Sequence, residues 1–317
     1  MAGPQGGSAM DPEERELLTQ ALRKMMTTTE PGAALDEALA RLGWREMLAE
    51  MPAVVIPLVF RLLGETGAYA PVLNDVIVAA RGDHPGPGDL VLPYAGGSWV
   101  VWDRGDAAGT ALELPLRRVA PAAATPLTPR ALAAGRVAAG WWLLGSGRAM
   151  LALARQHALD RVQFGRPIAS FQAVRHKLAD TLVALDGAEA VLNAAPVPVA
   201  GAGDDDLGAV PSQARPAQGL PEQALLAKAL AEQALPEQAL LVKALLAKAV
   251  AGQAALLAAR HCQQVLGGIG FTAEHALHHH VKRVLVLDGL LGSARELTRE
   301  AGRGVIADGR ASRLVDL

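Results

Sequence analysis

Two segments of the chain combine residue types that bind anionic groups. Residues 161–168 read Arg-Val-Gln-Phe-Gly-Arg-Pro-Ile, and the guanidinium of Arg161 is the permanently charged, multi-donor group that a diphosphate requires. Residues 263–270 read Gln-Gln-Val-Leu-Gly-Gly-Ile-Gly, and backbone N–H groups at a glycine-rich helix junction attract anionic oxygens. Either segment alone would also suit a plain helix end, so the prediction of an anion-binding surface depends on the pair.

Composition narrows the class of protein that must position these segments. The chain has 317 residues, a net charge of −2, 51% hydrophobic residues and 3% aromatic residues. Alanine, leucine and valine supply most of the hydrophobic content, which favours helices. The nearly neutral charge indicates no nucleic-acid partner, and the single cysteine, Cys262, fits a reducing compartment. No signal peptide or membrane-length apolar run is apparent, so we expect a cytoplasmic protein with no membrane partner.

Residues 10–125 predict two small units ahead of the anion-binding segments. Residues 10–81 are expected to form a short N-terminal helical domain, whose first helix has Asp11 as its N-cap. Residues 82–125 contain short runs with strand chemistry and a Gly96-Gly97 turn, and they predict a reduced β module. The expected helices after the first lie at residues 34–42 and 54–63, and the expected strands at residues 90–94, 98–103 and 112–119.

Residues 126–310 predict an antiparallel four-helix bundle, so the fold class is mainly α. Apolar residues recur at helical spacing, in a first helix that ends near Asp160 and a last helix that ends near Ala301. The expected N-caps of three of these helices are Thr128, Ser170 and Thr272.

Residues 196–235 are expected to be an insertion in the bundle, made of a flexible segment and part of an internal repeat. The repeat places Leu-Pro-Glu-Gln-Ala-Leu-Leu at residue 220 and again at residue 235. Pro221 and Pro236 each favour a helix start, so we expect two helical segments with a kink between them. The lysines and glutamates of the repeat are predicted to form a solvated face.

The two anion-binding segments resemble those of the C-terminal helical domain of the acyl-CoA dehydrogenase family. The matching residues are Arg161-x-x-Phe164-Gly165, Phe171-Gln172, Gln264-x-x-Gly267-Gly268 and Arg283. The resemblance implies FAD at a subunit interface, with Arg161 at the pyrophosphate, Phe164 packed near the cofactor and Gln172 towards the adenine. The implied cofactor-binding residues are Arg161, Gln163, Phe164, Gln172, Gln264, Gly267 and Gly268, the last three facing the FAD of the neighbouring subunit.

The resemblance also implies a reaction, the α,β-desaturation of an acyl-CoA thioester, in which a carboxylate removes the α-proton and FAD accepts the hydride. Family members carry that carboxylate in one of two places. One corresponds here to Leu291 or Gly292, and the other to Gly135 or its immediate neighbours. No acid stands at either place, and Asp288 lies about one helical turn before the first. We therefore expect no catalytic residue in this chain.

A second departure from the family pattern lies in residues 82–125, where catalytic members have a full β domain around the flavin ring. Trp99 and Trp102 are candidates for contact with the ring, although packing within the β module explains them better. This pattern resembles the degenerate subunit of heterotetrameric bacterial acyl-CoA dehydrogenases, whose catalytic subunit is the implied partner. Three interpretations stay open: such a subunit, an active dehydrogenase with Asp288 as base, and a scaffold that binds no FAD.

The remaining reactive side chains suit structural roles. His275 and His279 have helical metal-ligand spacing, but the family carries histidines in this stretch without a metal, so no metal site is expected. Phe164 and Cys262 look like buried residues.

Overall fold

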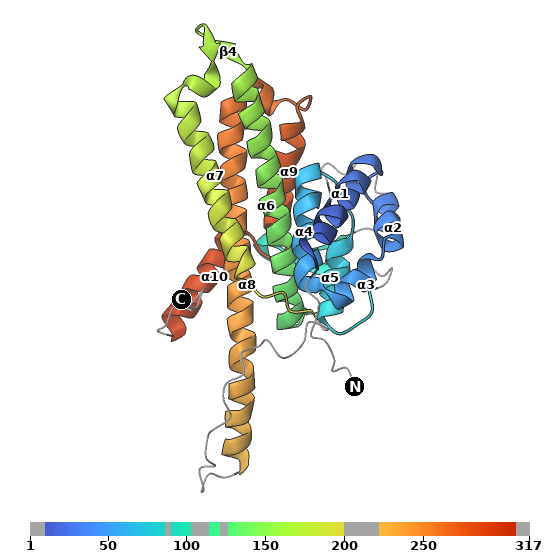
Figure 1. The fold of residues 1–317 in the computed structure, drawn as a ribbon. Coiled ribbons are helices and arrows are strands. Elements are labelled where there is room, and N and C mark those ends of the chain that lie inside the picture. The colour runs from blue at the N-terminus through green and yellow to red at the C-terminus, as the bar shows by residue number, and fades with distance from the viewer. Residues whose placement is uncertain (1–9, 86–89, 103–113, 121–125, 200–221, 309–317) are drawn as a thin grey trace.

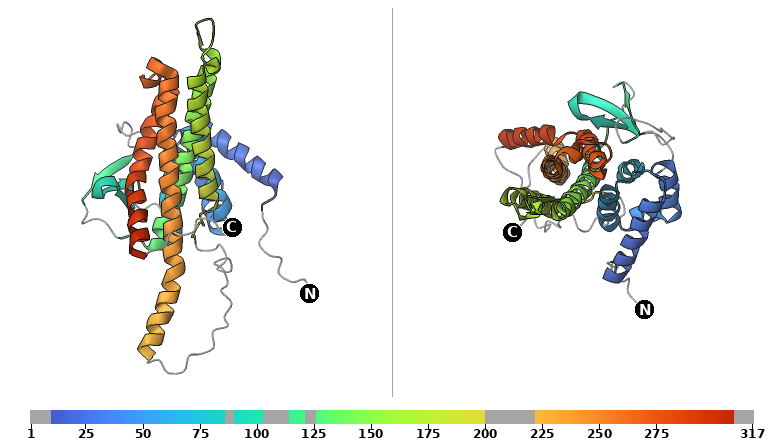
Figure 2. Two further views of the ribbon diagram at one scale, coloured as in Figure 1. Left: turned by 90° about the vertical axis from the view of Figure 1, so that its left-hand side faces the viewer. Right: turned by 90° about the horizontal axis from the view of Figure 1, so that it is seen from above.

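The computed structural model describes residues 10–85, 90–102, 114–120, 126–199 and 222–308, and only the backbone of residues 222–237. Long helices form a bundle, and the N-terminal helices lie against its side (Figure 1). The end-on view of Figure 2 shows the N-terminal helices and the strands at neighbouring positions beside the bundle. A mainly α fold is therefore confirmed.

The N-terminal unit is helical, as its sequence predicts. Its helices are α1 (Pro12–Thr28), α2 (Ala33–Arg41), α3 (Trp44–Glu50), α4 (Pro52–Thr66) and α5 (Val72–Ala80). The Asp11 side chain accepts a hydrogen bond from the backbone N–H of Glu13 and caps α1. Helix α4 crosses the bundle closely, because Cβ atoms on Gly64 and Gly145 would overlap backbone atoms of the facing helix. Close backbone approach therefore joins this unit to the bundle.

The β module is a three-stranded antiparallel sheet in the order β1-β2-β3. The strands are β1 (Val91–Tyr94), β2 (Ser98–Trp102) and β3 (Leu116–Val119), so the start of the predicted third strand lies outside the described residues. Gly96 and Gly97 have φ values of 73° and 70° and close the β1–β2 hairpin. Trp102 is fully buried and stacks on Trp142 with 5.7 Å between ring centroids, which joins the sheet to the bundle.

The bundle is built from four consecutive antiparallel helices. They are α6 (Pro129–Asp160), α7 (Gln172–Asn193), α8 (Glu222–Leu266) and α9 (Ala276–Gly289), followed by α10 (Ala294–Asp308). Thr128 caps α6, as predicted, by accepting a hydrogen bond from the N–H of Ala131. The connection from α6 to α7 contains a small hairpin, β4 (Val162–Gln163) and β5 (Arg166–Pro167). Antiparallel order brings the α6–α7 and α8–α9 connections to the same end.

Two predicted N-caps are wrong for the same reason. The hydroxyl of Ser170 donates to the carbonyl oxygen of Pro167, and that of Thr272 donates to the carbonyl oxygen of Ile269, so each bonds to the turn before it. Helix α7 begins after Phe171 with no side-chain cap. Helix α9 is capped instead by His275 Nδ1, which accepts from the N–H of Leu277 at 3.1 Å.

The predicted last helix is broken after α9. Leu290 forms a β-bridge with Tyr94, and the N–H of Leu291 donates to the carbonyl oxygen of Pro93. These bonds to the edge of β1 replace helical hydrogen bonds. Leu291 and Gly292 then adopt φ values of 60° and 101°, and the chain turns into α10. The break therefore depends on pairing with a distant strand.

The internal repeat does not form two kinked segments. Residues 222–266 make one continuous helix through Pro236, and Figure 1 shows its first part extending past the ends of α6 and α7. Proline removes one backbone hydrogen bond but does not prevent a helix from continuing, as Pro57 within α4 also demonstrates. By length and composition alone, α6 and residues 238–271 could cross a membrane, although 72% and 56% of their most apolar windows are buried within the protein.

Candidate functional site

The residues predicted to bind the cofactor gather at one end of the bundle, here called the motif end (residues 161–172 and 264–275). Figure 1 shows this end at the tip that carries β4. The α6–α7 and α8–α9 connections lie close together, because charges from both act on His157 at the end of α6. Burial lowers the pKa of His157 most, and the positive charges of His275 and Arg161 lower it further. The exposed members of the predicted set are Arg161, Gln163, Phe164, Gln172, Gln264, Gly267 and Gly268.

Phe164 occupies the tip of the β4–β5 hairpin and is 91% exposed, so its expected burial is wrong. Phe164 and Gly165 have φ values of 54° and 77°, which is the pattern of a two-residue type I′ turn. A bulky side chain with positive φ is an uncommon and strained choice for such a turn. Its ring packs against that of Phe171 in a T-shaped arrangement, and the Arg166 guanidinium lies 4.4 Å from the centre of the Phe171 ring. The hairpin thus presents an aromatic and cationic surface to solvent.

The glycine-rich connection after α8 leaves backbone atoms accessible. A Cβ atom on Gly268 would meet no atom within 4 Å, and its φ is not positive, so neither packing nor backbone geometry requires glycine there. Gly267 has equally open surroundings but a φ of 64°. Gly270 differs, because its Cβ would lie 2.9 Å from Leu266 Cβ. Gly267 and Gly268 therefore form an open stretch of backbone that a ligand could approach closely.

The two places predicted for a catalytic carboxylate meet in space. A Cβ atom on Gly135 would lie 2.8 Å from Leu291 Cδ1 and 3.0 Å from Ile77 Cγ1. Gly135 is buried and Leu291 is 1% exposed. Two positions from opposite ends of the bundle sequence therefore converge on one location, which holds an aliphatic side chain and no acid.

The Asp288 carboxylate lies against α8 and the start of α10. Its Oδ1 accepts a hydrogen bond from the N–H of Ala294 at 3.0 Å and so caps α10. The same oxygen would lie 2.5 Å from a Cβ on Gly252, which places the carboxylate against α8. Asp288, the acid nearest in sequence to the predicted base position, therefore stabilises the turn between α9 and α10.

Lys248 and Arg136 hold the α9–α10 corner (residues 288–296) from within the protein. Lys248 Nζ donates to the carbonyl oxygens of Asp288 and Gly292 at 3.0 and 2.6 Å, while Arg136 Nε donates to that of Leu291 at 3.2 Å. Lys248 is fully buried, so the prediction that the repeat's lysines form a solvated face is wrong here. Burial lowers the pKa of Lys248 to about 7, against the attraction of Asp288. The signal in the sequence was the run of apolar residues on both sides of this lysine.

The remaining reactive groups have structural surroundings. Arg283 is buried, and its Nη1 donates to the carbonyl oxygen of Gly67, which connects α9 to the N-terminal unit. Burial raises the pKa of the Cys262 thiol to about 12. Within the described part of the chain, no three His, Cys, Asp or Glu side chains are grouped as metal ligands would be.

The chain is similar to known acyl-CoA dehydrogenases. Residues 126–211 match the family model for the acyl-CoA dehydrogenase C-terminal domain. Acyl-CoA dehydrogenase IpdE2 of Mycobacterium tuberculosis is 30% identical over 216 residues, which cover 67% of this chain and 55% of that protein. FadE34 of the same organism is 30% identical over 227 residues, which cover 67% of this chain and 27% of that protein. The chain thus spans about half, or less, of the length of these curated relatives.

Solved structures share the fold over nearly the whole chain. The ChsE4-ChsE5 complex from Mycobacterium tuberculosis is matched with a TM-score of 0.58 and 18% identity, over 95% of this chain and 99% of that one. A glutaryl-CoA dehydrogenase from Mycobacterium smegmatis in complex with FADH2 has a TM-score of 0.63 and 15% identity, over 95% and 96% of the chains. With the paired motifs and the domain match, this fold places the chain in the acyl-CoA dehydrogenase family.

Proposed function

We propose that this chain is a flavoprotein subunit that contributes the pyrophosphate and adenine half of an interfacial FAD site and supplies no catalytic base. The observation that carries the proposal is the contact between Gly135 and Leu291. Both places for the carboxylate converge there, and both hold residues that cannot accept a proton. The motif end, by contrast, keeps the exposed arginine and glycines that cofactor binding requires.

The side chains of the motif end fit one half of a dinucleotide site. Arg161 is exposed and forms no ion pair with another described residue, so its guanidinium is available to a diphosphate. Gly268 has no packing or φ requirement for glycine, which suits close approach of a ligand to the backbone. The strain of Phe164 at an exposed turn would be offset by contact with a flat aromatic group. These features support FAD as the ligand.

In the proposed complex, bound FAD would supply the hydride acceptor for the α,β-desaturation of an acyl-CoA thioester. Arg161 would bind the pyrophosphate, Gln163 and Phe164 would cover the cofactor, and Gln172 would bind towards the adenine. Gln264 and the backbone N–H groups of Gly267 and Gly268 would contact a second FAD, held mainly by the neighbouring subunit. The carboxylate that removes the α-proton would come from that subunit, a catalytic acyl-CoA dehydrogenase.

A heteromeric partner is the favoured assembly because one of the matched structures, ChsE4-ChsE5, is a complex of two different proteins. A homo-oligomer would contain no carboxylate at either base position. Asp288 as the base of an independently active enzyme is disfavoured, because its carboxylate caps α10. A scaffold that binds no FAD would leave the open glycines and the strained Phe164 without a role.

The test is to purify the chain alone and with a co-expressed acyl-CoA dehydrogenase that has a glutamate at one of the two base positions. We expect little FAD and no acyl-CoA-dependent dye reduction by the chain alone, and stoichiometric FAD with turnover by the complex. Arg161→Ala in the complex should lower bound FAD, measured by its visible absorbance, while Arg299→Ala on α10 should not.

Three results would contradict the proposal. Turnover by the chain alone, lost in Asp288→Asn, would establish an independent enzyme. A complex with the Arg161→Ala chain that retains all its FAD would remove the assigned role of this arginine. A stable complex without FAD would establish a scaffold.

A further inference from the structure

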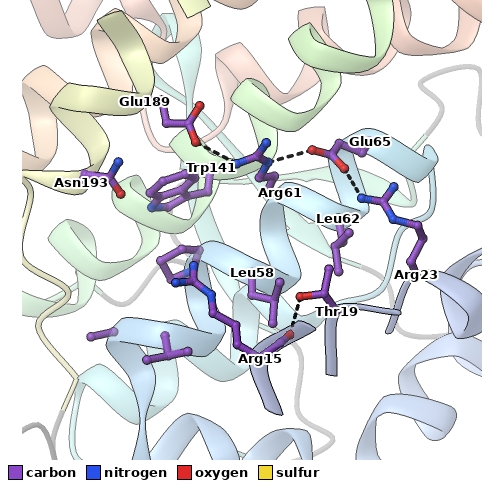
Figure 3. A pocket seen from close by; sticks show the side chains of 13 residues that line it. Arg15, Thr19, Arg23, Leu58, Arg61, Leu62, Glu65, Trp141, Glu189 and Asn193 are labelled. Atoms are coloured by element: carbon purple, nitrogen blue, oxygen red, sulfur yellow. Dashed lines mark hydrogen bonds and ion pairs between the residues drawn. The ribbon is translucent and has the colours of Figure 1, made fainter. Parts of the chain in front are cut away.

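A cavity of about 550 Å³ lies where α1 and α4 meet α6 and α7 (Figure 3). None of its lining residues belongs to the motif end or to the α9–α10 corner. Its volume is within the range of small-molecule sites, about 300–1,000 Å³. The cavity is therefore large enough for a ligand and separate from the proposed FAD site.

The lining of the cavity is mostly polar, but apolar side chains form part of its wall, next to a break in helical hydrogen bonding. Leu58 and Leu62 of α4 and Trp141 of α6 line it, and Trp141 is 4% exposed. Pro57 lies inside α4 and has no N–H, so the carbonyl oxygen of Ala53 lacks its usual helical donor. Ala53 and Pro57 both line the cavity. This part of the wall thus combines a few apolar side chains with a helical turn that lacks one of its usual hydrogen bonds.

The rim of the cavity is charged, and its charges do not cancel. Arg61 donates to Glu65 and Glu189, each at 2.7 Å, and Arg23 donates to Glu65 at 2.6 Å, as Figure 3 shows. Arg15 reaches the rim from α1 and forms no ion pair with another described residue. Three guanidinium groups against two carboxylates leave one positive charge uncompensated.

We propose that this cavity binds an amphipathic monoanion, a carboxylate on an apolar skeleton. The apolar part would cover Leu58 and Trp141, and the carboxylate would pair with Arg15 at the rim. The ligand would contact α1 and α4 on one side and α6 and α7 on the other. It would therefore link the N-terminal helices to the bundle, independently of cofactor binding.

Decanoate, titrated below its micelle concentration into the full chain or its complex, tests the site by calorimetry. We expect decanoate to bind, and decylamine and decanol to bind at least about tenfold more weakly, because a charge-assisted hydrogen bond separates them. Arg15→Gln should weaken decanoate binding about tenfold, while Arg299→Gln, also an exposed arginine on a helix, should not change it. No binding of decanoate, or equal binding of all three probes, would overturn the proposal, as would unchanged affinity in Arg15→Gln.

Glu65→Gln gives a test of opposite sign. Removing this carboxylate releases Arg23, leaves Arg61 paired with Glu189 alone and adds a positive charge to the rim, so decanoate should bind several-fold more tightly. Circular dichroism would confirm that the variant is folded. Weaker or unchanged binding by a folded Glu65→Gln chain would show that the rim charge does not select the ligand. Neither result depends on whether the motif end binds FAD.

Discussion

The Nζ atom of Lys248 in α8 lies 2.6 Å from the carbonyl oxygen of Gly292, beyond the end of α9. It also donates to the carbonyl oxygen of Asp288 at 3.0 Å, so one amine holds both sides of the turn that carries Leu291. Lys248 is fully buried. Lys248 therefore fixes the turn that places the aliphatic side chain of Leu291 at the predicted base position. Its amine loses its hydration when the protein folds.

This burial gives the stability of the protein a pH dependence. The pKa of Lys248 is about 7 in the folded protein, below the ordinary lysine value of 10.5, so between these values the unfolded chain binds a proton that the folded chain does not. The free energy of unfolding should thus rise with pH in this window, by up to about 1.4 kcal/mol per pH unit from this group. Urea unfolding of Lys248→Met should show a smaller slope. Lys243→Met, on the same helix, should keep the slope, and equal slopes in both variants would refute the assignment.

His280 predicts a loss of stability in acid. Burial, and then the charge of Arg283, lowers its pKa from 6.5 to about 4, and it is 8% exposed. The neutral ring is favoured in the folded state, so its contribution is complete above pH 6.5 and lost as the pH falls towards 4. His280→Leu should reduce the drop in unfolding free energy over this range, by as much as about 3 kcal/mol. The exposed neighbour His279 is the control, and its replacement by leucine should leave the drop in place.

The contact between Gly135 and Leu291 predicts energetic coupling. Gly135→Ala should destabilise the protein by about 1–3 kcal/mol, because the added Cβ overlaps Leu291 Cδ1 and approaches Ile77. In a Leu291→Ala background the same change should cost at least about 1 kcal/mol less. Gly187→Ala, on α7 with open surroundings, should instead stabilise by about 0.5–1 kcal/mol. A coupling energy near zero would contradict the convergence of the two base positions.

Phe164 predicts a conflict between stability and cofactor binding. Asparagine is well suited to a positive-φ turn position before glycine, so Phe164→Asn should raise the free energy of unfolding by about 0.5–1 kcal/mol. If the ring covers FAD, the same variant should retain less flavin in the purified complex. Val162→Asn, an exposed change in the same hairpin, serves as the control for flavin content. Undiminished flavin in Phe164→Asn would assign the ring another role.

Local signals in the sequence predicted local structure well. Asp11 and Thr128 cap the helices that they precede, because each side chain accepts a hydrogen bond from a backbone N–H in the first turn of its helix. Ser170 and Thr272 have similar chemistry, but each lies at the end of a short turn, and its hydroxyl donates to a carbonyl oxygen of that turn instead. The residues around these four side chains do not show which will cap the following helix and which will bond to the preceding turn.

Features that depend on distant residues were not predictable in this way. The break after α9 requires the edge of β1, and the burial of Lys248 requires the corner to fold over it. The gathering of the predicted cofactor residues at one end follows from antiparallel helix order, which apolar periodicity does indicate. That Gly135 meets Leu291 follows from three-dimensional packing alone. The cofactor-binding roles themselves stay predictions.

Helix α9 separates the motif end from the α9–α10 corner by 14 residues, or about 20 Å of rigid rod. Its capping His275 lies at one terminus, and the turn with Leu291 follows the other. Mutations that fill the corner with aliphatic side chains therefore need not disturb the loops at the far end. Such spacing would let a duplicated gene lose its chemistry by drift while selection continued to preserve its half of a shared interface.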